Sequence, residues 1–146
     1  MSTLREISQA IEAQLNLIPG LRVAEFPQPS LTPPLAWPVV TGWQPVAMGR
    51  TGQVLVSIDV YVFTSATVRS IDGYRALLRY ADWTGPDSIW LALWDGNDQA
   101  AGTFVGLTNT QLNVDTDQGF RALGLEEVDA FQMNGGVFSI QVVTKG

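Results

Sequence analysis

The chain has 146 residues, of which 46% are hydrophobic and 15% are charged, and its formal net charge is −6 at pH 7. This length and apolar fraction predict one domain over residues 1–146, large enough to bury roughly 70% of the surface that the unfolded chain exposes. No apolar run approaches the ~20 residues that a membrane-spanning helix needs, so we expect no membrane partner. The excess of acids opposes binding to nucleic-acid phosphates as a main function.

The chain has no cysteine and no histidine, two residue types on which much of enzyme chemistry depends. Its only lysine is Lys145. These absences exclude disulfides, thiolate metal sites, thiol catalysis and a Ser-His-Asp relay. They also make a P-loop or a buried Schiff-base lysine implausible. An enzyme with this sequence would have to act through carboxylates. We therefore expect no catalytic residue, no cofactor and no metal site.

The first predicted element is an amphipathic helix. Thr3 and Glu6 have the spacing of a capping box, and the apolar pattern that follows stops at Pro19-Gly20. The residues that recur at helical intervals are Leu4, Ile7, Ile11, Leu15 and Ile18. The opening MSTLREISQAIEAQ has an early acid and no continuous apolar stretch, so we expect neither a secretory signal nor a transit peptide.

A half-buried strand is predicted over residues 21–26, LRVAEF, because apolar and polar residues alternate there. Residues 27–38, PQPSLTPPLAWP, then hold five of the chain's eight prolines, which excludes a helix interior or a central strand. Three interpretations are open: an interdomain linker, a Pro-rich ligand for another protein, or a rigid arm inside one domain. The chain returns to the sheet near Ala36 to Thr41.

The segment from Gly42 to Gln53 is predicted to be a loop, and it carries two hydrophobic residues, Trp43 and Met48. It is either a plain hairpin connection or a docking loop that becomes ordered on a partner.

The strongest strand signal is QVLVSIDVYVFTS, residues 53–65. One face is predicted to lie in the core, and it carries Val54, Val56, Ile58, Val60 and Val62. The other face mixes polar and aromatic side chains, which suits partial cover by a helix or a neighbouring subunit. Its residues are Leu55, Ser57, Asp59, Tyr61 and Phe63.

Two more helices are predicted after this strand. Ser65 or Thr67 can cap the first, which runs to about Asp82 and whose apolar stripe consists of Ile71, Tyr74, Leu78 and Ala81. The second is shorter, GPDSIWLALW, with proline tolerated in its first turn. It ends at DGND, where Asp95 and Asp98 are interpreted as turn residues rather than as a metal-binding pair.

From Thr103 onward the pattern is β again, with TNTQLNVDT, a glycine-bearing loop and VDAFQMNGGVFSIQVV. Asn134-Gly135-Gly136 is either a tight hairpin turn or a glycine bulge within one long strand, and we favour the bulge. The predicted order α-β-β-β-α-α-β-β indicates an α+β fold. We expect an antiparallel or mixed sheet with two to three helices packed on it, in a single domain.

Several of these segments together resemble the tail terminator proteins of long-tailed siphophages, a family also described as minor tail or tail completion proteins. The segments are IPGLRV, PPLAWPVV, VFTSATVRS and YRALLRYADWTGPDSIWLAL, followed by an aromatic-bearing C-terminal strand. The matched positions are Pro33, Pro34, Ser65, Arg69, Tyr80 and Gly85. The likeness spans almost the whole chain and rests on order and spacing, without a catalytic signature. The tryptophans Trp43, Trp83, Trp90 and Trp94 are not matched to the family's pattern.

The resemblance implies a non-enzymatic virion protein that is assembled in the host cytoplasm and forms a homohexameric ring at the top of the tail tube. Such a ring stops polymerisation of the major tail tube protein and offers the surface that joins a head-tail connector or neck protein. The proline stretch is then a rigid arm inside one domain. The alternatives are a neck protein and, more remotely, a carboxylate-dependent hydrolase that uses Asp115, Asp117, Glu126, Glu127 or Asp129.

Three groups of residues are candidates for contacts in such an assembly. The candidates for subunit contacts are Tyr61, Phe63, Arg69, Trp83 and Trp90, because aromatic residues are enriched at interfaces. The candidates for docking on the tail tube are Trp43 and Met48. DNA would only pass through the lumen of the ring, and Asp115 and Asp117 are expected to face that lumen and keep the phosphates from binding.

Overall fold

The computed structural model describes residues 2–24, 33–46, 52–65, 70–113, 119–128 and 131–145. In these ranges the chain forms three helices, a curled mixed sheet of six strands and a small antiparallel sheet of three short strands. In chain order the elements are α1 (Leu4–Leu15), β1 (Arg22–Val23), β2 (Leu35–Pro45), β3 (Val54–Ser65), α2 (Ser70–Ala81), α3 (Ile89–Asp95), β4 (Asn97–Asp98), β5 (Thr103–Phe104), β6 (Leu107–Thr108), β7 (Thr110–Asn113), β8 (Phe120–Val128) and β9 (Phe131–Thr144). The predicted α+β single-domain fold is confirmed.

The large sheet is built around β9, its longest strand. The strand order is β1-β2-β3-β9-β7, and β8 also pairs with β9. Because β3 occupies one edge of β9, β8 and β7 divide the other edge: β8 pairs with residues 131–138 and β7 with residues 141–144. Only β1 runs parallel to its neighbour, β2, and the other pairs are antiparallel.

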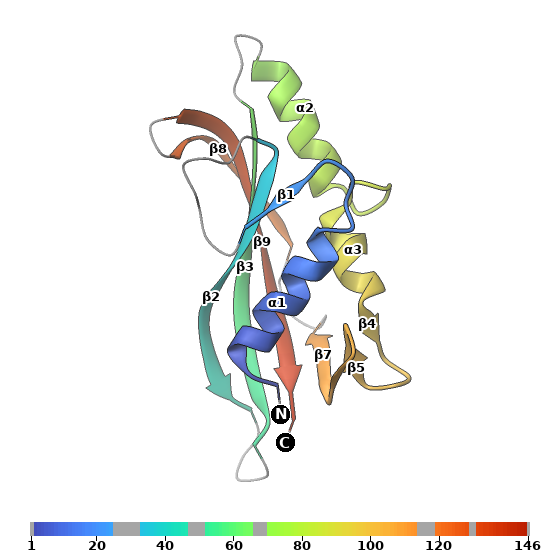
Figure 1. The fold of residues 1–146 in the computed structure, drawn as a ribbon. Helices are drawn as coiled ribbons and strands as arrows, with labels where there is room; N and C mark the ends of the chain where they lie inside the picture. The colour runs from blue at the N-terminus through green and yellow to red at the C-terminus, as the bar shows by residue number, and fades with distance from the viewer. Residues whose placement is uncertain are drawn as a thin grey trace.

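The three helices pack on one face of the long strands β2, β3 and β9 (Figure 1). On α1 the residues one turn apart, Ile7, Ile11 and Leu15, are all fully buried against this face. The predicted capping box starts the helix: the Thr3 hydroxyl accepts from the Glu6 amide at 3.2 Å, and the Thr3 amide donates to Glu6 Oε1 at 3.0 Å. The predicted core face of β3 is also confirmed, since Val56, Ile58, Val60 and Val62 are at most 1% exposed.

The opposite face of the sheet holds a second, smaller core. Trp37 of β2 stacks on Phe63 of β3 with ring centroids 5.0 Å apart and on Tyr61 at 5.9 Å, and Tyr61 and Phe63 lie 6.3 Å apart. Met133 of β9 and Leu123 of β8 pack against these rings, because the sheet curls. Strands of the same sheet therefore cover this part of the face, where the sequence suggested a helix or a neighbouring subunit.

The apolar stripe predicted for α2 is wrong at Tyr74 and Leu78, whereas its last member, Ala81, packs against the core as predicted. Tyr74 and Leu78 are 49% and 44% exposed, whereas Leu77 and Tyr80 are 1% and 4% exposed and face the core. Both sets have helical spacing, so the periodicity of the segment alone does not distinguish them. The packing of α2 against β3 and β9 selects the buried face.

Strand boundaries also differ from the prediction. Strand β2 extends through Pro45, so residues 42–45 belong to the sheet and not to a loop. Residues 120–128, expected to be mostly loop, form β8, and the short strands β4, β5 and β6 were not predicted as a sheet of their own. Of the strand predicted over residues 21–26, the structure describes Arg22–Val23 as β1.

Asn134-Gly135-Gly136 lies inside the single strand β9, so the hairpin alternative is wrong. Pairing of β9 with β3 is continuous here, and the bulge lies in the partner strand β8, where the register shifts between Ala122 and Gly124. The two glycines allow close approach: a Cβ on Gly135 would lie 2.6 Å from the Phe63 ring, and one on Gly136 would lie 2.2 Å from the Phe120 ring.

The first half of the proline stretch, residues 27–32, lies outside the described residues, so its role as a rigid arm stays a prediction. The peptide bond between Pro33 and Pro34 is cis. Pro38 lies in β2, past Leu35 and Ala36, the two β2 residues that the structure pairs with β1. Among the described residues, no helix is both long and apolar enough to cross a membrane.

Candidate functional site

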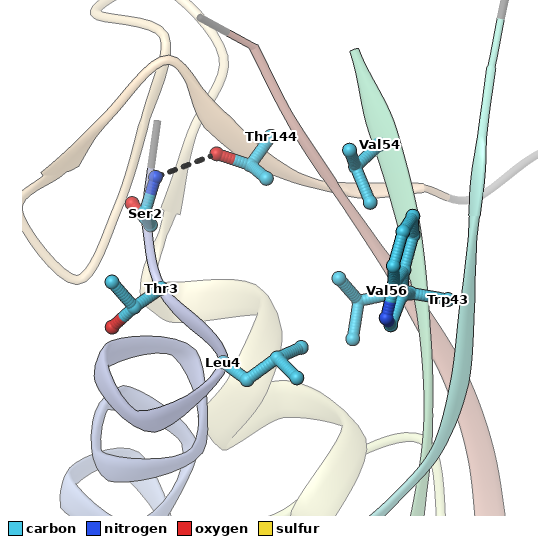
Figure 2. Close-up of a pocket in the computed structure, with 7 residues that line it drawn as sticks. All are labelled: Ser2, Thr3, Leu4, Trp43, Val54, Val56 and Thr144. Carbon is cyan, nitrogen blue, oxygen red and sulfur yellow. Dashed lines mark hydrogen bonds between the residues drawn. The ribbon is translucent and has the colours of Figure 1, made fainter. Parts of the chain in front are cut away.

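The first candidate surface is a hollow of about 340 Å³ between the start of α1 and the ends of β2, β3 and β9, which we call the N-terminal cleft. Figure 2 shows Leu4 extending from α1 toward the strands, with Trp43 and Val56 on the opposite wall. Most of its lining is apolar, and the residues are Ser2, Thr3, Leu4, Trp43, Val54, Val56 and Thr144. Leu4 is 42% and Trp43 60% exposed, which is unusual for side chains of this size.

Hydrogen bonds hold the α1 side of the cleft in place. The Ser2 amide donates to Thr144 Oγ1 at 3.0 Å (Figure 2). The hydroxyls of Ser2 and Thr110 lie 2.8 Å apart. Thr110 and Thr144 are in turn linked at 3.1 Å, and both side chains are buried. This hydroxyl cluster ties the beginning of the chain to its last strand, so Leu4 keeps a defined position opposite Trp43.

A β-bulge in β2 decides where Trp43 points. Val40 pairs with Ile58 and Gly42 with Ser57, so Thr41 is an extra residue in β2. As a result Trp43 pairs with Val56 on the helix-covered face. In an unbroken register it would pair with Leu55 and face the other way, since a shift of one residue reverses the face of every later side chain.

The second candidate surface is a larger hollow of about 660 Å³ beside the link between α2 and α3, which we call the tryptophan groove. Its lining consists of Leu78, Ala81, Asp82, Trp83, Trp90, Gly119, Phe120 and Phe138. Trp83 is 79% exposed, and Trp90 is partly buried where it stacks on Trp94 with centroids 6.0 Å apart. An indole side chain left this exposed is a candidate contact residue.

The link that carries Trp83 is held by Ser88, the N-cap of α3. Its hydroxyl donates to the Asp82 carbonyl at 2.6 Å and accepts from the Leu91 amide at 3.1 Å. The Ser88 amide donates to the Gly85 carbonyl at 3.2 Å. These hydrogen bonds connect residues on both sides of Trp83 within the link between α2 and α3. They therefore fix the backbone from which the Trp83 side chain projects.

A third hollow, of about 290 Å³, is polar and lies beside β7, at the end of the large sheet where β3 begins and β9 ends. Its lining includes Asn109, Gln111, Asn113 and Lys145. The Gln111 amide is already used, since it donates to the carbonyls of Asp98 at 2.8 Å and Thr103 at 2.9 Å. The Gln111 side chain thus serves the packing of β7 on the small sheet.

The predicted contact residues do not form one surface. Trp83 and Trp90 meet in the tryptophan groove, whereas Tyr61 and Phe63 lie in the aromatic stack of the smaller core. Phe63 is 4% exposed, so its side chain is not available to another copy, and the prediction for this residue is corrected. Trp43 belongs to a strand and not to a loop. Arg69, Met48, Asp115 and Asp117 lie outside the described residues.

Among the members of these surfaces that the sequence missed are two exposed leucines, Leu4 and Leu78. Both have the helical spacing of buried residues, and both were assigned to apolar stripes. They lie at the margins of their helices' buried faces and are 42% and 44% exposed. The signal that could have found them is the excess of apolar residues over what one helix face can bury.

Two groups, the Glu6 carboxyl and the Tyr80 phenol, have pKa values that are shifted by their surroundings. Hydrogen bonds from the backbone and side chain of Thr3 lower the pKa of Glu6, and burial, followed by the charge of Asp87, raises the pKa of Tyr80. Neither lies in a cluster of acids, and the described ranges contain no group of three acidic residues placed to hold a metal ion.

The comparison with known proteins adds no relative that would assign a role to these residues. The chain matches no protein-family model and no curated protein sequence, so the N-terminal cleft and the tryptophan groove are interpreted from their own geometry.

Proposed function

We propose that this chain is a structural protein of a phage tail: a tail terminator that assembles as a hexameric ring on the tail tube, ends its polymerisation and offers the surface to which the head is joined. The proposal starts from the sequence resemblance to tail terminator proteins. The structural observation that supports it best is that one chain exposes two apolar surfaces, the N-terminal cleft and the tryptophan groove, which have no described lining residue in common.

Two different apolar surfaces on one chain favour an assembly over an isolated monomer. Trp43 and Trp83 are 60% and 79% exposed, and exposed aromatic surface of this kind is typical of contact sites. A ring with cyclic symmetry needs two unlike surfaces on each subunit, because every subunit contacts its two neighbours through different patches. A two-fold dimer would need only one. The arrangement therefore fits a ring better than a simple dimer.

The hydrolase alternative receives less support from the same hollows. Glycoside hydrolysis by carboxylates needs two acids that flank the scissile bond across a cleft. Among the described residues that line the three hollows, Asp82 of the tryptophan groove is the one acid, and no second described acid lines that groove. Apolar walls with one carboxylate suit contact with a protein surface more than they suit acid-base chemistry.

The proposal is tested by co-expressing the chain with the major tail tube protein encoded in the same genome. Electron microscopy should show six-fold rings at one end of the tubes, and the tubes should be shorter than those formed by the tube protein alone. A neck protein would instead bind only tails that already carry a terminator. Tubes of unchanged length with uncapped ends, together with a monomer in light scattering, would contradict the proposal.

A further inference from the structure

We infer that copies of this chain associate head to tail, with Trp83 of one copy seated in the N-terminal cleft of the next. The inference deepens the proposed function and rests on it for the closure of these contacts into a ring. It is drawn from the shape, the apolar character and the charge of two surfaces that lie apart on one chain. In Figure 1 the start of α1 lies near one end of the molecule, while the link between α2 and α3 projects at its side.

Trp83 has the form of a projecting contact residue. With 79% of its surface exposed, it is the most exposed large hydrophobic residue in the described part of the chain. The hydrogen bonds of Ser88 to the Asp82 carbonyl and to the Leu91 amide hold the backbone on either side of it. A side chain displayed from an ordered link loses little conformational freedom when it is buried by a partner, and such preorganisation increases affinity.

The N-terminal cleft has the size and chemistry to accept an indole ring. Its volume is about 340 Å³, and its walls are formed by Leu4 on one side and by Trp43, Val54 and Val56 on the other. An aromatic side chain enclosed between such walls buries roughly 150–250 Å². The lining also carries the hydroxyls of Ser2, Thr3 and Thr144, and a hydroxyl oxygen that already takes part in one hydrogen bond can accept a second one from the indole N–H.

The charges beside the two surfaces are complementary. Arg5 follows Leu4 at the cleft and is exposed, while the adjacent Glu6 carboxylate is occupied by its hydrogen bond from the Thr3 amide. The link that carries Trp83 holds two acids, Asp82 and Asp87, and no cation. Within the described ranges neither Arg5 nor Asp82 forms an ion pair. With Trp83 in the cleft, Arg5 would face these acids of the neighbouring copy, and opposite charges at the rim fix the orientation of such a contact.

The inference assigns Trp43 a different role from the one its position in the sequence suggested. A loop residue would be free to dock on the tail tube, but the bulge at Thr41 directs Trp43 into a wall of the cleft, opposite Leu4. It would therefore contact another copy of this chain and not the tube.

The first test compares self-association of the purified full-length chain and its variants by sedimentation velocity over a range of concentrations. We expect Trp83→Ser to abolish association, and Arg5→Asp or Asp82→Arg alone to weaken it by roughly tenfold or more. The double variant Arg5→Asp with Asp82→Arg should recover most of the loss, because the opposite charges are then exchanged. Leu17→Ser is the matched control, since Leu17 is 69% exposed but lines neither surface. If Trp83→Ser and Leu17→Ser behave alike, the inference is wrong.

The second test uses the absence of cysteine from the chain, which allows single thiols to be introduced without background. Thr84 follows Trp83, and Pro45 pairs with Val54 beside the cleft; both are exposed. A chain that carries both Thr84→Cys and Pro45→Cys should give a ladder of oligomers with a short bismaleimide. Each single variant alone should stay monomeric, and an equimolar mixture of the two should give dimers only. Cross-linking within a single variant would indicate a symmetric contact and overturn the inference.

The results separate this inference from the proposed function. Rings on tail tubes without a ladder from the double-cysteine chain would overturn the head-to-tail contact and leave the proposed function in place. A ladder from a protein that never caps tubes would support the contact and overturn the function. A monomer in every experiment, at high concentration and in the presence of tubes, would overturn both.

Discussion

Gln14 of α1 donates a hydrogen bond through Nε2 to the backbone carbonyl of Ala92 in α3, over 2.7 Å. Ala92 lies in the last turn of α3, where carbonyl groups have no partner within the helix. The Gln14 side chain is 9% exposed, so this polar contact is made inside the helical layer. The hydrogen bond joins two residues that are 78 positions apart in the sequence. It connects α1 to α3 and helps to set the position of α3, which carries Trp90.

We expect Gln14→Ala to lower the free energy of unfolding by about 1–3 kcal/mol, because the Ala92 carbonyl would lose its partner in a partly buried position. Urea denaturation followed by circular dichroism measures this. Gln9→Ala is the matched control, since Gln9 is exposed on the same helix and its loss should change stability by about 0.5 kcal/mol or less. Equal losses in the two variants would show that the hydrogen bond contributes nothing.

A methyl group at Gly136 should be destabilising, because its Cβ would lie 2.2 Å from Cε2 of Phe120, whose ring packs against Phe138. We expect Gly136→Ala to cost about 1–3 kcal/mol, the usual range for overpacking. Gly119→Ala is the control, since nothing lies within 4 Å of a Cβ at that position. Adding Phe120→Leu to Gly136→Ala should recover part of the loss. Thermal unfolding that is the same for both alanine variants would contradict the close packing of these strands.

The capping box makes stability depend on pH in the acid range. Hydrogen bonds from the Thr3 backbone and side chain lower the pKa of Glu6 below its ordinary value of 4.5. A carboxyl whose pKa is lower in the folded state stabilises the fold above its unfolded pKa, and this contribution is lost as the pH falls through the folded pKa. Glu6→Gln keeps a carbonyl that can accept from the Thr3 amide but does not titrate.

We therefore expect wild type to be more stable than Glu6→Gln near neutral pH, and the difference to disappear as the pH falls below 4.5. Urea midpoints measured at several pH values provide the comparison. Thr3→Ala, which removes the hydroxyl of the cap, should cost about 1 kcal/mol at neutral pH. If wild type and Glu6→Gln lose stability in parallel across the acid range, the lowered pKa of Glu6 does not contribute.

Tyr80 makes stability depend on pH at the alkaline end. Burial, and after it the negative charge of Asp87, raise the pKa of Tyr80 above its ordinary value of 10.0. A group whose folded pKa is raised stabilises the fold fully below its unfolded pKa, and this contribution is lost as the pH rises through the folded pKa. The Tyr80 side chain is 4% exposed in the core between α2 and the sheet.

We expect Tyr80→Phe to resemble wild type near neutral pH and to lose less stability above pH 10.0. Thermal unfolding at a series of alkaline pH values measures the difference. Asp87→Asn should make the alkaline loss smaller without moving its onset, because the folded pKa then lies closer to the unfolded value, at which the loss begins. Identical alkaline profiles for wild type and Tyr80→Phe would show that ionisation of another group limits stability there.

The sequence by itself determined the elements whose signals are local. The capping box at Thr3 and Glu6 needs only a spacing of three residues, and the structure confirms both of its hydrogen bonds. The alternation along β3 identifies its core face in the same way, because side chains of a strand point to alternate sides. These local signals, with the order of helices and strands, were sufficient to predict an α+β fold in one domain.

Only the tertiary structure decided which of several equivalent local patterns is used. On α2 two stripes have helical spacing, and packing on the sheet buries Leu77 and Tyr80 while it leaves Leu78 exposed. On β2 the pairing partner decides the face: the extra residue Thr41 turns Trp43 toward Leu4, which lies 39 positions earlier in the chain (43 − 4).

The candidate surfaces belong to this second class. The tryptophan groove combines Trp83 and Trp90 with Phe120, which comes from a strand that the sequence did not predict, and with Phe138 of the strand beside it. No periodicity along the chain can reveal that these side chains meet, because the distances between them are set by strand pairing and by the curl of the sheet. The types of residue available for contact are a property of the sequence, whereas their assembly into two separate apolar surfaces is a property of the fold.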